Sequence, residues 1–398
     1  MPDFYQHELV TTVHDLHTAN LEQLETLLHR SVVQNKIGLI LPVTASDMRA
    51  DAFSSIVQHL TQADYIEKIV VSLGVAPEQS DYDETVSKIA CLGDRAKVLW
   101  TDGPNVQAIY QELIDEGIAV STPGKGRSVW TALGYLLGTP NIETFVLHDC
   151  DIVDYDRLLL ARLCLPMVHP GLDFEFCKAY YARVTDRMHG RVVRLLVSPL
   201  LRALLQMIPA SRFVQFLANF RYPLSGEFSM TRNLARTNRV PSDWGLEVGT
   251  LAEVFRNTSL KRVCQVDLCR LYEQKHQQLA INEKERGLMK MAIDILTTVY
   301  RTLASQGIVL SHSTFVSLRA SYLRMAQDCI RQYSADAVVN DIQFDRHAEE
   351  AAVEAFAQCV TTAGEMYRDD PNGAAAIPNW TRVRAAFPDM IDRLCDTV

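Results

Sequence analysis

The sequence predicts an α/β protein, in which a mostly parallel sheet flanked by helices is followed by a helical C-terminal region. Three observations favour this class. Apolar runs of strand length alternate with helical stretches over about residues 37–152, as in parallel sheets that are covered on both faces. Strands follow less regularly up to about residue 280, and the apolar spacing over 281–398 is almost entirely helical. The expected regions are an N-terminal helical cap at 1–36, an α/β domain at 37–280 and a helical region at 281–398.

Four strands are expected in the first half of the α/β domain, each a buried apolar run bounded by Pro, Gly or polar residues. They are IGLILPV at 37–43, KIVVSLG at 68–74, AKVLWTD at 96–102 and TFVLHDCDI at 144–152. Helical spacing precedes and separates them at 20–30, 47–62, 81–91, 105–117 and 126–137. Because ligands of parallel sheets bind beyond the carboxyl ends of the strands, Pro42, Ser72, Asp102 and Asp149 are expected to line one crevice.

The pattern changes after residue 152. Strands are expected within 173–184, 225–232 and 261–269, and helices over 243–255 and 287–304. The Pro- and Gly-rich stretch 369–380 predicts a loop. The apolar segment 194–209 is interrupted by Pro199 and Arg202 and is compatible with a core helix or a membrane-surface helix, of which the core helix is favoured.

Composition restricts the class of partner. The 398 residues carry a formal net charge of -9, whereas a general nucleic-acid binder usually presents a basic face. Nine scattered Cys without a C-x-x-C pair argue against a zinc ribbon or a disulfide scaffold and favour a reducing cytoplasmic location. The N-terminus lacks the pattern of a signal peptide, and no run approaches the roughly 18 apolar residues of a membrane span.

Two carboxylates follow the fourth predicted strand, at Asp149 and Asp151 on either side of Cys150. In an extended strand, residues i and i+2 lie on the same face. Where the chain turns at the strand end, both carboxylates can reach one ion, one of them directly and one through water. Hard oxygen ligands suit Mg²⁺ or Mn²⁺, which commonly bridge substrate phosphates. A solvated acidic turn is the alternative reading of this short pattern.

The stretch STPGKGRSVW at 121–130 places Lys125 between two glycines at the start of a predicted helix. It is not a Walker loop, because Ala119 and Gly126 stand where that motif needs Gly and Ser or Thr. A lysine at a helix N-terminus is slightly unfavourable by itself. A bound anion makes the lysine favourable at this position, because the free backbone N–H groups and the ammonium both face the anion. A surface lysine is the alternative. His276, in YEQKHQ after the last predicted strand, is a weaker candidate ligand, with Gln274 beside it.

The order of these motifs resembles a known family. PGKG before a helix, a strand ending in D-x-D, then GRV, PLSGE, DWGLEVG and a strand followed by E-x-K-H resemble the retaining glycosyltransferases that make glucosyl-3-phosphoglycerate and mannosyl-3-phosphoglycerate. The resemblance covers about residues 37–277. It implies a GT-A fold that transfers glucose or mannose from a sugar nucleotide such as UDP-glucose to 3-phosphoglycerate or glycerate, with a divalent metal. The nucleotide would bind within 37–152 and the acceptor within 153–280.

The resemblance also implies roles for individual residues. Asp151 and His276 would hold Mg²⁺ or Mn²⁺, and Lys125, Asp151 and Glu247 would act in catalysis. The acceptor would bind at Gly190, Arg191 and Val193. The residues implied to bind the sugar nucleotide are Pro42, Val43, Thr44, Ser72, Lys125, Asp149, Cys150, Leu224, Ser225, Gly226 and Glu227.

Several positions depart from the family pattern. GRVT reads GRVV, so the acceptor loses a hydroxyl contact at Val193. The middle of D-S-D is Cys150. A gap-free alignment puts the metal-binding histidine on Gln274, so that Gln274 is the fallback for His276. The acidic residue of the first loop is not reproduced in PVTASD, where Asp47 is the candidate substitute.

The hypothesis for the mechanism follows from the residue types. Lys125 and the metal would neutralise the diphosphate leaving group. No residue is an obvious nucleophile, so the acceptor hydroxyl would attack on the same face of the sugar while the leaving phosphate takes its proton, with Glu247 orienting the substrates. The alternatives are a nucleotidyltransferase, a non-enzymatic sugar-nucleotide sensor and a membrane glycosyltransferase. The amphipathic C-terminal helices suit a homodimer or packing on their own domain equally well.

Overall fold

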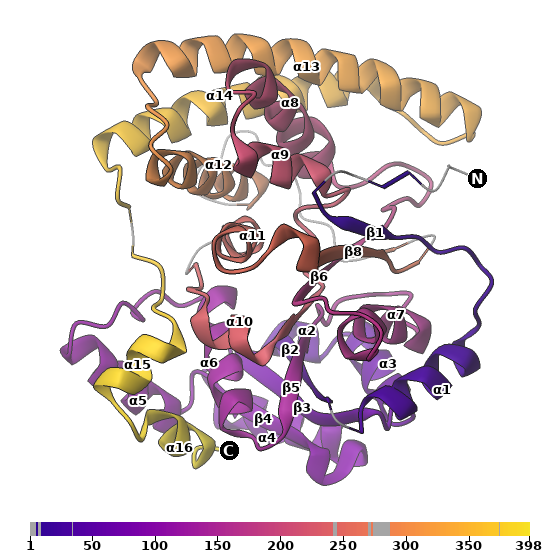
Figure 1. Cartoon of the computed structure of the whole chain (residues 1–398), viewed down its shortest axis with the longest axis vertical. Helices are drawn as coiled ribbons and strands as arrows, with labels where there is room; N and C mark the ends of the chain where they lie inside the picture. Colours follow the sequence, from indigo (N-terminus) through magenta and orange to yellow (C-terminus); the bar gives the residue numbers. More distant parts are fainter. Residues whose placement is uncertain are drawn as a thin grey trace.

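An eight-stranded sheet forms the centre of the protein (Figure 1). The computed structural model describes residues 5–6, 9–33, 35–241, 245–269, 272–273, 287–373 and 375–398. The strands lie in the order β1-β8-β6-β7-β5-β2-β3-β4. Their bounds are β1 Thr11–Val13, β2 Lys36–Thr44, β3 Ile66–Gly74, β4 Ala96–Trp100, β5 Ile142–Leu147, β6 Phe176–Tyr180, β7 Phe228–Thr231 and β8 Val263–Asp267.

The sheet is mostly parallel, which confirms the predicted class. Only β7, within the described residues, runs antiparallel to its neighbours β5 and β6. From β2 the chain continues to β3 and β4 on one side and returns to β5 on the other, so the border between β2 and β5 is a switch point where ligands of such sheets bind. Pairing of β2 with β5 ends at Ile40, whereas pairing with β3 continues through Pro42 to Thr44. Pro42 therefore removes no hydrogen bond to β5.

Helices cover both faces of the sheet, and successive strand residues point into two separate apolar clusters. Leu39 and Leu41 belong to one cluster and Ile40 to the other, as the period of two requires. The first cluster lies under α1 Leu21–Ser31, α2 Ala45–Met48, α3 Asp51–Leu60, α4 Gln79–Ile89 and α7 Arg157–Val168. The second lies under α5 Pro104–Asp115 and α6 Lys125–Gly138 and continues into the C-terminal helices.

The predicted elements of the first half are present, with three differences. The helix expected over 47–62 is divided into α2 and α3, because Ala50 adopts an extended conformation between them. Helix α7 was not predicted: nearly all its residues are buried, so its sequence lacks an amphipathic period, and Pro166 lies inside it. Strand β1 joins the sheet beside β8 within the region expected to be a helical cap, and its three residues are too few for a periodic signal.

The remaining elements complete the fold: most of them form the upper part of the molecule in Figure 1, whereas the last two helices of the chain lie in its lower part. Segment 194–209 is a core helix, as favoured, and begins with a π-helical turn at Val192–Val197. The helices are α8 Ser198–Met207, α9 Arg212–Asn219, α10 Arg232–Thr237, α11 Leu246–Asn257, α12 Gly287–Ser305, α13 His312–Val339, α14 Arg346–Asp369, α15 Trp380–Ala386 and α16 Met390–Cys395. None of the helices in the described ranges has both the length and the apolar character to cross a bilayer.

The last two helices leave the C-terminal bundle and pack against α6. The indole rings of Trp130 and Trp380 stack with centroids 4.2 Å apart. The Trp130 indole donates to the Pro378 carbonyl at 2.8 Å, and the Trp380 indole donates to the Trp130 carbonyl at 2.9 Å. A Cβ on Gly134 would lie 2.0 Å from the Trp380 ring, so this close approach requires glycine. The C-terminal segment is thus part of the packing of α6.

Candidate active site

The candidate site begins at the N-terminus of α6, where Lys125 is the first helical residue. Gly124 precedes it at φ 154° and ψ 178°, a conformation that is accessible to glycine because it has no Cβ. The Lys125 ammonium lies 2.6 Å from Asp149 Oδ1 and 3.4 Å from Glu247 Oε1. One lysine thus joins α6, the chain beyond β5 and the first turn of α11.

The charge of Lys125 is stabilised by its two partners. Burial alone would lower its pKa, but the carboxylates of Asp149 and Glu247 outweigh burial and raise the pKa above its ordinary value. Glu247 lies in the first turn of α11, where the helix dipole favours a negative charge. The Lys125 side chain keeps 31% of its surface exposed, so a ligand can still reach it. The arrangement is a fixed positive charge at the end of the sheet.

The loop from Leu224 to Glu227 lies against Asp149. A Cβ on Gly226 would be 2.3 Å from Asp149 Oδ2, so only glycine allows the loop to approach the carboxylate this closely. Ser225 is buried and donates through Oγ to the Ala179 carbonyl at 2.8 Å. Leu224 is also buried. The structure therefore brings together the predicted residues of the PGKG, D-x-D and PLSGE motifs.

Glu227 is fully buried between two tyrosines. The hydroxyl groups of Tyr181 and Tyr272 donate to its two carboxylate oxygens, each at 2.6 Å, and their rings stack 3.7 Å apart. Burial and the nearby Asp149 raise the Glu227 pKa, while the two hydroxyl groups lower it. With both oxygens occupied, Glu227 is suited to fixing the wall of the site. The sequence pattern did not predict these tyrosines, whose contacts with Glu227 are long-range.

His148 fixes the backbone that carries the two aspartates. Its Nδ1 lies 2.8 Å from the Asp149 carbonyl, which can only accept, so Nδ1 carries a proton. The Tyr155 hydroxyl at 3.3 Å then donates to Nε2. Burial lowers the His148 pKa to about 4, which keeps the ring neutral at physiological pH. The buried Cys150 is a neutral thiol too, because burial and the aspartates raise its pKa.

Lys178 is a site residue that the sequence pattern did not single out. It lies in the middle of β6, has no exposed surface, and donates to the Ser225 carbonyl at 2.6 Å. Burial lowers its pKa to about 8, against the carboxylates of Glu247 and Glu227, which raise it. The available signal was a lysine inside the apolar strand EFCKAYY, where a buried charge is costly unless it has a role.

The predicted nucleotide-binding residues of the first strands lie beside this cluster. Pro42 and Ser72 are register neighbours on β2 and β3. Ser72 is buried and donates to the Ser128 carbonyl on α6 at 3.0 Å, which ties β3 to the helix of Lys125. Thr44, the N-cap residue of α2, donates through its hydroxyl to the Asp47 carboxylate at 2.7 Å. Val43, which lies between Pro42 and Thr44 in the sequence, is buried.

The predicted acceptor segment is held by the C-terminal region. Gly190 has φ +70°, and Arg191 follows it before the π-helical turn. Arg191 Nε lies 3.1 Å from Oε1 of Glu349 on α14, and Arg194 Nη1 lies 2.7 Å from Oε2 of the same carboxylate. Glu349 is 158 residues from Arg191 and could not be predicted as its partner. The Val193 side chain is buried in the core.

The predicted metal ligands are only partly described. Asp151 is half-buried just after β5, whereas Gln274 and His276 lie outside the described residues. Within the described residues, no three His, Cys, Asp or Glu side chains form a group that could hold a metal. The Val153 amide donates to the Glu273 carbonyl at 3.0 Å, so the described chain immediately before Gln274 lies against the loop of Asp151. The hard oxygens of Asp151 suit Mg²⁺ or Mn²⁺.

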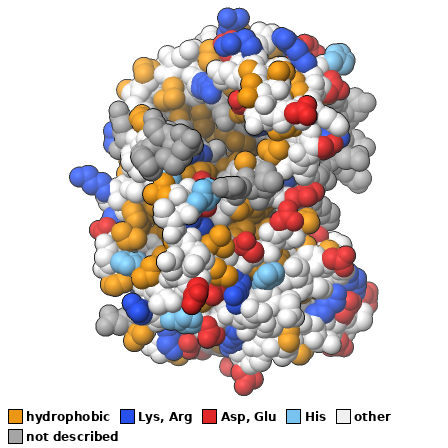
Figure 2. Space-filling model, turned by 90° about the vertical axis from the view of Figure 1, so that its right-hand side faces the viewer, with side chains coloured by type: hydrophobic (Ala, Val, Ile, Leu, Met, Phe, Trp, Pro, Cys, Tyr) orange, Lys and Arg blue, Asp and Glu red, His pale blue; other side chains and the backbone are white. Residues whose placement is uncertain are grey.

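Figure 2 shows one face of the molecule with a hollow between its upper and lower parts. Hydrophobic side chains are visible in and around this hollow, and acidic and basic side chains are interspersed over the face.

Comparison with known proteins gives full-length relatives. The chain is 44% identical over 398 residues to a glucosyl-3-phosphoglycerate synthase of Persephonella marina. The alignment covers 100% of this chain and 98% of the relative. It is 40% identical over 397 residues to a glucosyl-3-phosphoglycerate synthase of Methanococcoides burtonii, covering 98% and 96%. No family model matches the chain.

Solved structures show the same fold at lower identity. The mannosyl-3-phosphoglycerate synthase of Rubrobacter xylanophilus has a TM-score of 0.56 at 22% identity, covering 76% of this chain and 83% of that one. The glucosyl-3-phosphoglycerate synthase of Mycobacterium tuberculosis, in complex with Mn²⁺, UDP-glucose and phosphoglyceric acid, has a TM-score of 0.54 at 22% identity, covering 77% and 90%. These likenesses support the predicted GT-A fold.

Proposed function

The chain belongs to the family of glucosyl-3-phosphoglycerate synthases, and on that premise we propose that it transfers glucose from UDP-glucose to 3-phosphoglycerate. The observation that carries this proposal is the junction of Lys125 with Asp149 and Glu247 at the ends of the sheet. A sugar nucleotide presents a diphosphate beside a neutral hexose, and this site offers one fixed cation between carboxylates that accept hydrogen bonds from sugar hydroxyls. The nucleotide would bind to the part formed by 37–152 and the acceptor to that formed by 153–280.

Lys125 is proposed to receive the diphosphate. As the bond between the anomeric carbon and the phosphate oxygen breaks, negative charge accumulates on the leaving diphosphate, and a cation already in place stabilises it. A negatively charged ligand would also face the N-terminus of α6, whose dipole favours it. Gly124 and Gly126 on either side of the lysine leave room for close approach of phosphate oxygens.

Asp151 is proposed to hold a divalent Mg²⁺ or Mn²⁺, with His276 or, as fallback, Gln274 completing the site. When bound, such an ion withdraws charge from the diphosphate. Asp149 has other contacts, because its carboxylate forms an ion pair with Lys125 and lies against Gly226. The two aspartates therefore have separate roles, Asp151 toward the metal and Asp149 toward the lysine and the sugar nucleotide.

The transfer is proposed to retain the configuration of the sugar. The oxygen of the acceptor hydroxyl forms the new bond to the anomeric carbon on the face from which the diphosphate departs, and the hydroxyl proton passes to a phosphate oxygen of the leaving group. Glu247 orients the substrates through hydrogen bonds. Glu227 is not proposed as a nucleophile, because both of its oxygens are bonded to tyrosine hydroxyls.

The acceptor is proposed to bind at Gly190 and Arg191. A guanidinium group can bind phosphate or carboxylate oxygens in a bidentate manner. Arg191 shares Glu349 with Arg194, so the pair of arginines exceeds the single carboxylate by one positive charge. Arg194 also donates to the His189 carbonyl at 2.8 Å, which fixes the segment before Gly190.

The direct test is to incubate the purified protein with UDP-glucose or GDP-mannose, and with 3-phosphoglycerate or glycerate, with and without Mg²⁺. We expect glucosyl-3-phosphoglycerate from the first donor and the first acceptor, only with metal. Release of UDP without a glycosylated product would contradict transfer and favour the sugar-nucleotide sensor. Activity restricted to a lipid acceptor would favour the membrane glycosyltransferase instead.

Asp151→Asn is expected to raise the Mg²⁺ concentration needed for half-maximal activity by at least about tenfold, because an amide replaces a charged ligand. Direct Mn²⁺ binding, measured by calorimetry, should weaken in parallel. Asp154→Asn removes an exposed carboxylate three residues away and is the matched control. Equal metal dependence in the Asp151 variant and the wild type would refute the metal assignment.

Lys178 is expected to make donor binding depend on pH. Below its pKa of about 8 the ammonium is charged and offsets nearby carboxylates; above that value the charge is lost and the site repels the donor diphosphate. The KM for UDP-glucose should therefore rise as the pH increases through about 8. Lys178→Met should show a raised KM at every pH and no such inflection, whereas the exposed control Lys261→Met should behave as wild type. An inflection that persists in Lys178→Met would assign it to another group.

We also propose that the protein is cytoplasmic and forms a homodimer through its C-terminal helices. The nine scattered cysteines, with no C-x-x-C pair, suit a reducing compartment. At the end of α13, the neighbouring valines Val338 and Val339 are 77% and 84% exposed. Two adjacent exposed apolar side chains are a candidate contact for a second copy of the chain. Light scattering on the wild type and on Val338→Asp/Val339→Asp tests the dimer: a wild-type monomer would exclude it.

A further inference from the structure

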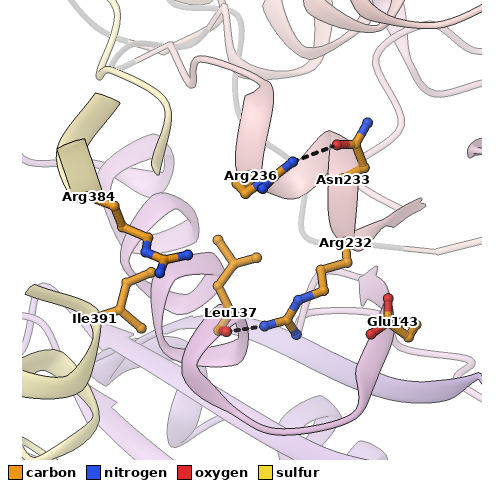
Figure 3. Close-up of a pocket in the computed structure, with 7 residues that line it drawn as sticks. All are labelled: Leu137, Glu143, Arg232, Asn233, Arg236, Arg384 and Ile391. Atoms are coloured by element: carbon orange, nitrogen blue, oxygen red, sulfur yellow. Dashed lines mark hydrogen bonds between the residues drawn. The ribbon is translucent and has the colours of Figure 1, made fainter. Parts of the chain in front are cut away.

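A cationic cavity lies away from the candidate active site. It has a volume of about 300 Å³ and is lined by Arg232, Arg236, Arg384 and Glu143, with Asn233 beside them (Figure 3). Three chain segments meet there: the C-terminal end of α6 with the start of β5, the short helix α10, and the helices α15 and α16. Figure 3 shows Arg232 and Arg384 on opposite sides of Leu137.

Arg232 is anchored without being neutralised. Its guanidinium donates to the Leu137 carbonyl, to the Ile142 carbonyl at 2.8 Å and to the Thr139 carbonyl at 3.4 Å. These acceptors are uncharged and include the free carbonyls at the end of α6, which a cation satisfies well. The hydrogen bonds therefore hold the guanidinium in place, and its positive charge is not cancelled by them.

Arg236 and Arg384 have exposed side chains at the rim of the cavity. Arg236 contacts the neutral amide of Asn233, at 3.1 Å from Oδ1. Among the described residues, none of the three arginines forms an ion pair with a carboxylate, and Glu143 in the same lining is not within bonding distance of them. Three arginines and one glutamate give the lining a formal charge of +2, in a chain whose net charge is -9.

The cavity and the candidate active site lie at opposite ends of α6. Lys125 is the first residue of this helix and Leu137 is next to the last, so the two sites are about 18 Å apart along the helix axis at 1.5 Å per residue. The helix α10 directly follows β7, and β7 follows Glu227. A ligand in the cavity would thus contact elements that continue to the reaction site without touching that site.

We propose that this cavity binds a phosphate group, free or as a small phosphate monoester. Guanidinium groups present paired donors that match phosphate oxygens, and the concave shape concentrates their field. Leu137 and Ile391 supply an apolar surface for the organic part of a monoester. Because Arg232 and Leu137 belong to the sheet side and Arg384 and Ile391 to the C-terminal segment, the bound phosphate would hold the segment against α6.

The test measures binding of inorganic phosphate and of glycerol 3-phosphate by calorimetry at low ionic strength, with the full chain saturated with UDP. UDP fills the donor part of the reaction site, and an Arg191→Gln version of each protein separates binding at the proposed acceptor segment from binding in the cavity. Arg236→Gln/Arg384→Gln removes two exposed cations that have no part in the reaction site. Arg212→Gln/Arg331→Gln makes the same change in charge at exposed arginines on α9 and α13 and is the matched control.

Phosphate should bind to the wild type and to the control, and its affinity should fall about tenfold or more in the Arg236/Arg384 variant, as expected on losing charged hydrogen bonds. Tighter binding of the monoester would identify an organic phosphate as the ligand, and equal binding would identify phosphate itself. Two results would overturn the proposal. One is equal affinity for phosphate in all three proteins. The other is no binding to the wild type at about 10 mM phosphate, a concentration at which only a Kd weaker than about 10 mM would escape detection.

Discussion

Lys125→Met should fold normally and lose a factor of about 10²–10³ in kcat, the loss found when one preorganised donor to a developing negative charge is removed. Lys125 is the cation that holds Asp149 at 2.6 Å, and methionine preserves the length of its side chain without the charge. The carboxylates of Asp149 and Glu247 outweigh the effect of burial and raise the pKa of the ammonium, so the charge is present throughout the working pH range. The measurement is kcat at saturating UDP-glucose, 3-phosphoglycerate and Mg²⁺.

Lys125→Arg is the matched variant, because it keeps the charge but changes its shape, and it should retain part of the activity. Circular dichroism and thermal unfolding should show that both variants keep the fold. A Lys125→Met enzyme with wild-type kcat and only a raised KM for the donor would indicate that the lysine binds the substrate and the transition state equally, without specifically stabilising the leaving group.

Trp380→Ala is expected to lower the free energy of unfolding by about 3–5 kcal/mol, the range for truncating a large buried aromatic side chain. Trp380 is fully buried, stacks on Trp130 and donates to the Trp130 carbonyl. The measurement is urea unfolding followed by circular dichroism. If the bundle and the α/β domain unfold separately, the transition that contains α6 is the one that should shift.

The control is a double-mutant cycle with Trp130→Ala. If the two rings stabilise the fold through each other, the double variant should lose less stability than the sum of the single variants, because stacking contributes about 0.5–1.5 kcal/mol beyond burial. Purely additive losses would mean that each ring acts through other neighbours. No measurable loss in Trp380→Ala would show that the C-terminal segment does not support α6.

The α/β half of the fold was predictable because its strands are buried on both faces and appear as unbroken apolar runs. Strands β2 and β3 extend the predicted runs by only one or two residues. Helix α7 escaped prediction for the same physical reason: an element buried on all sides has no polar face, and thus no helical period. The three-residue β1 is defined by its partner β8 and not by its own sequence.

The candidate site was predictable where residues cluster at strand and helix ends. Lys125 was expected at the start of a helix and Asp149 at the end of a strand, and the structure places them in contact. Lys178 and Glu349 were not predicted, since each acts through a partner far away in the sequence. Their roles depend on the tertiary fold, which a local pattern does not encode.

The stacking of Trp380 on Trp130 also determines when α6 can complete its packing during synthesis of the chain on the ribosome. The two residues are 250 positions apart, which corresponds to roughly 13–50 s of translation at 5–20 residues per second. During that interval, α6 has emerged without the partner that covers its Gly134 face. The nascent chain therefore carries an uncovered aromatic surface, and the helix that begins with Lys125 reaches its final packing only after synthesis has passed residue 380.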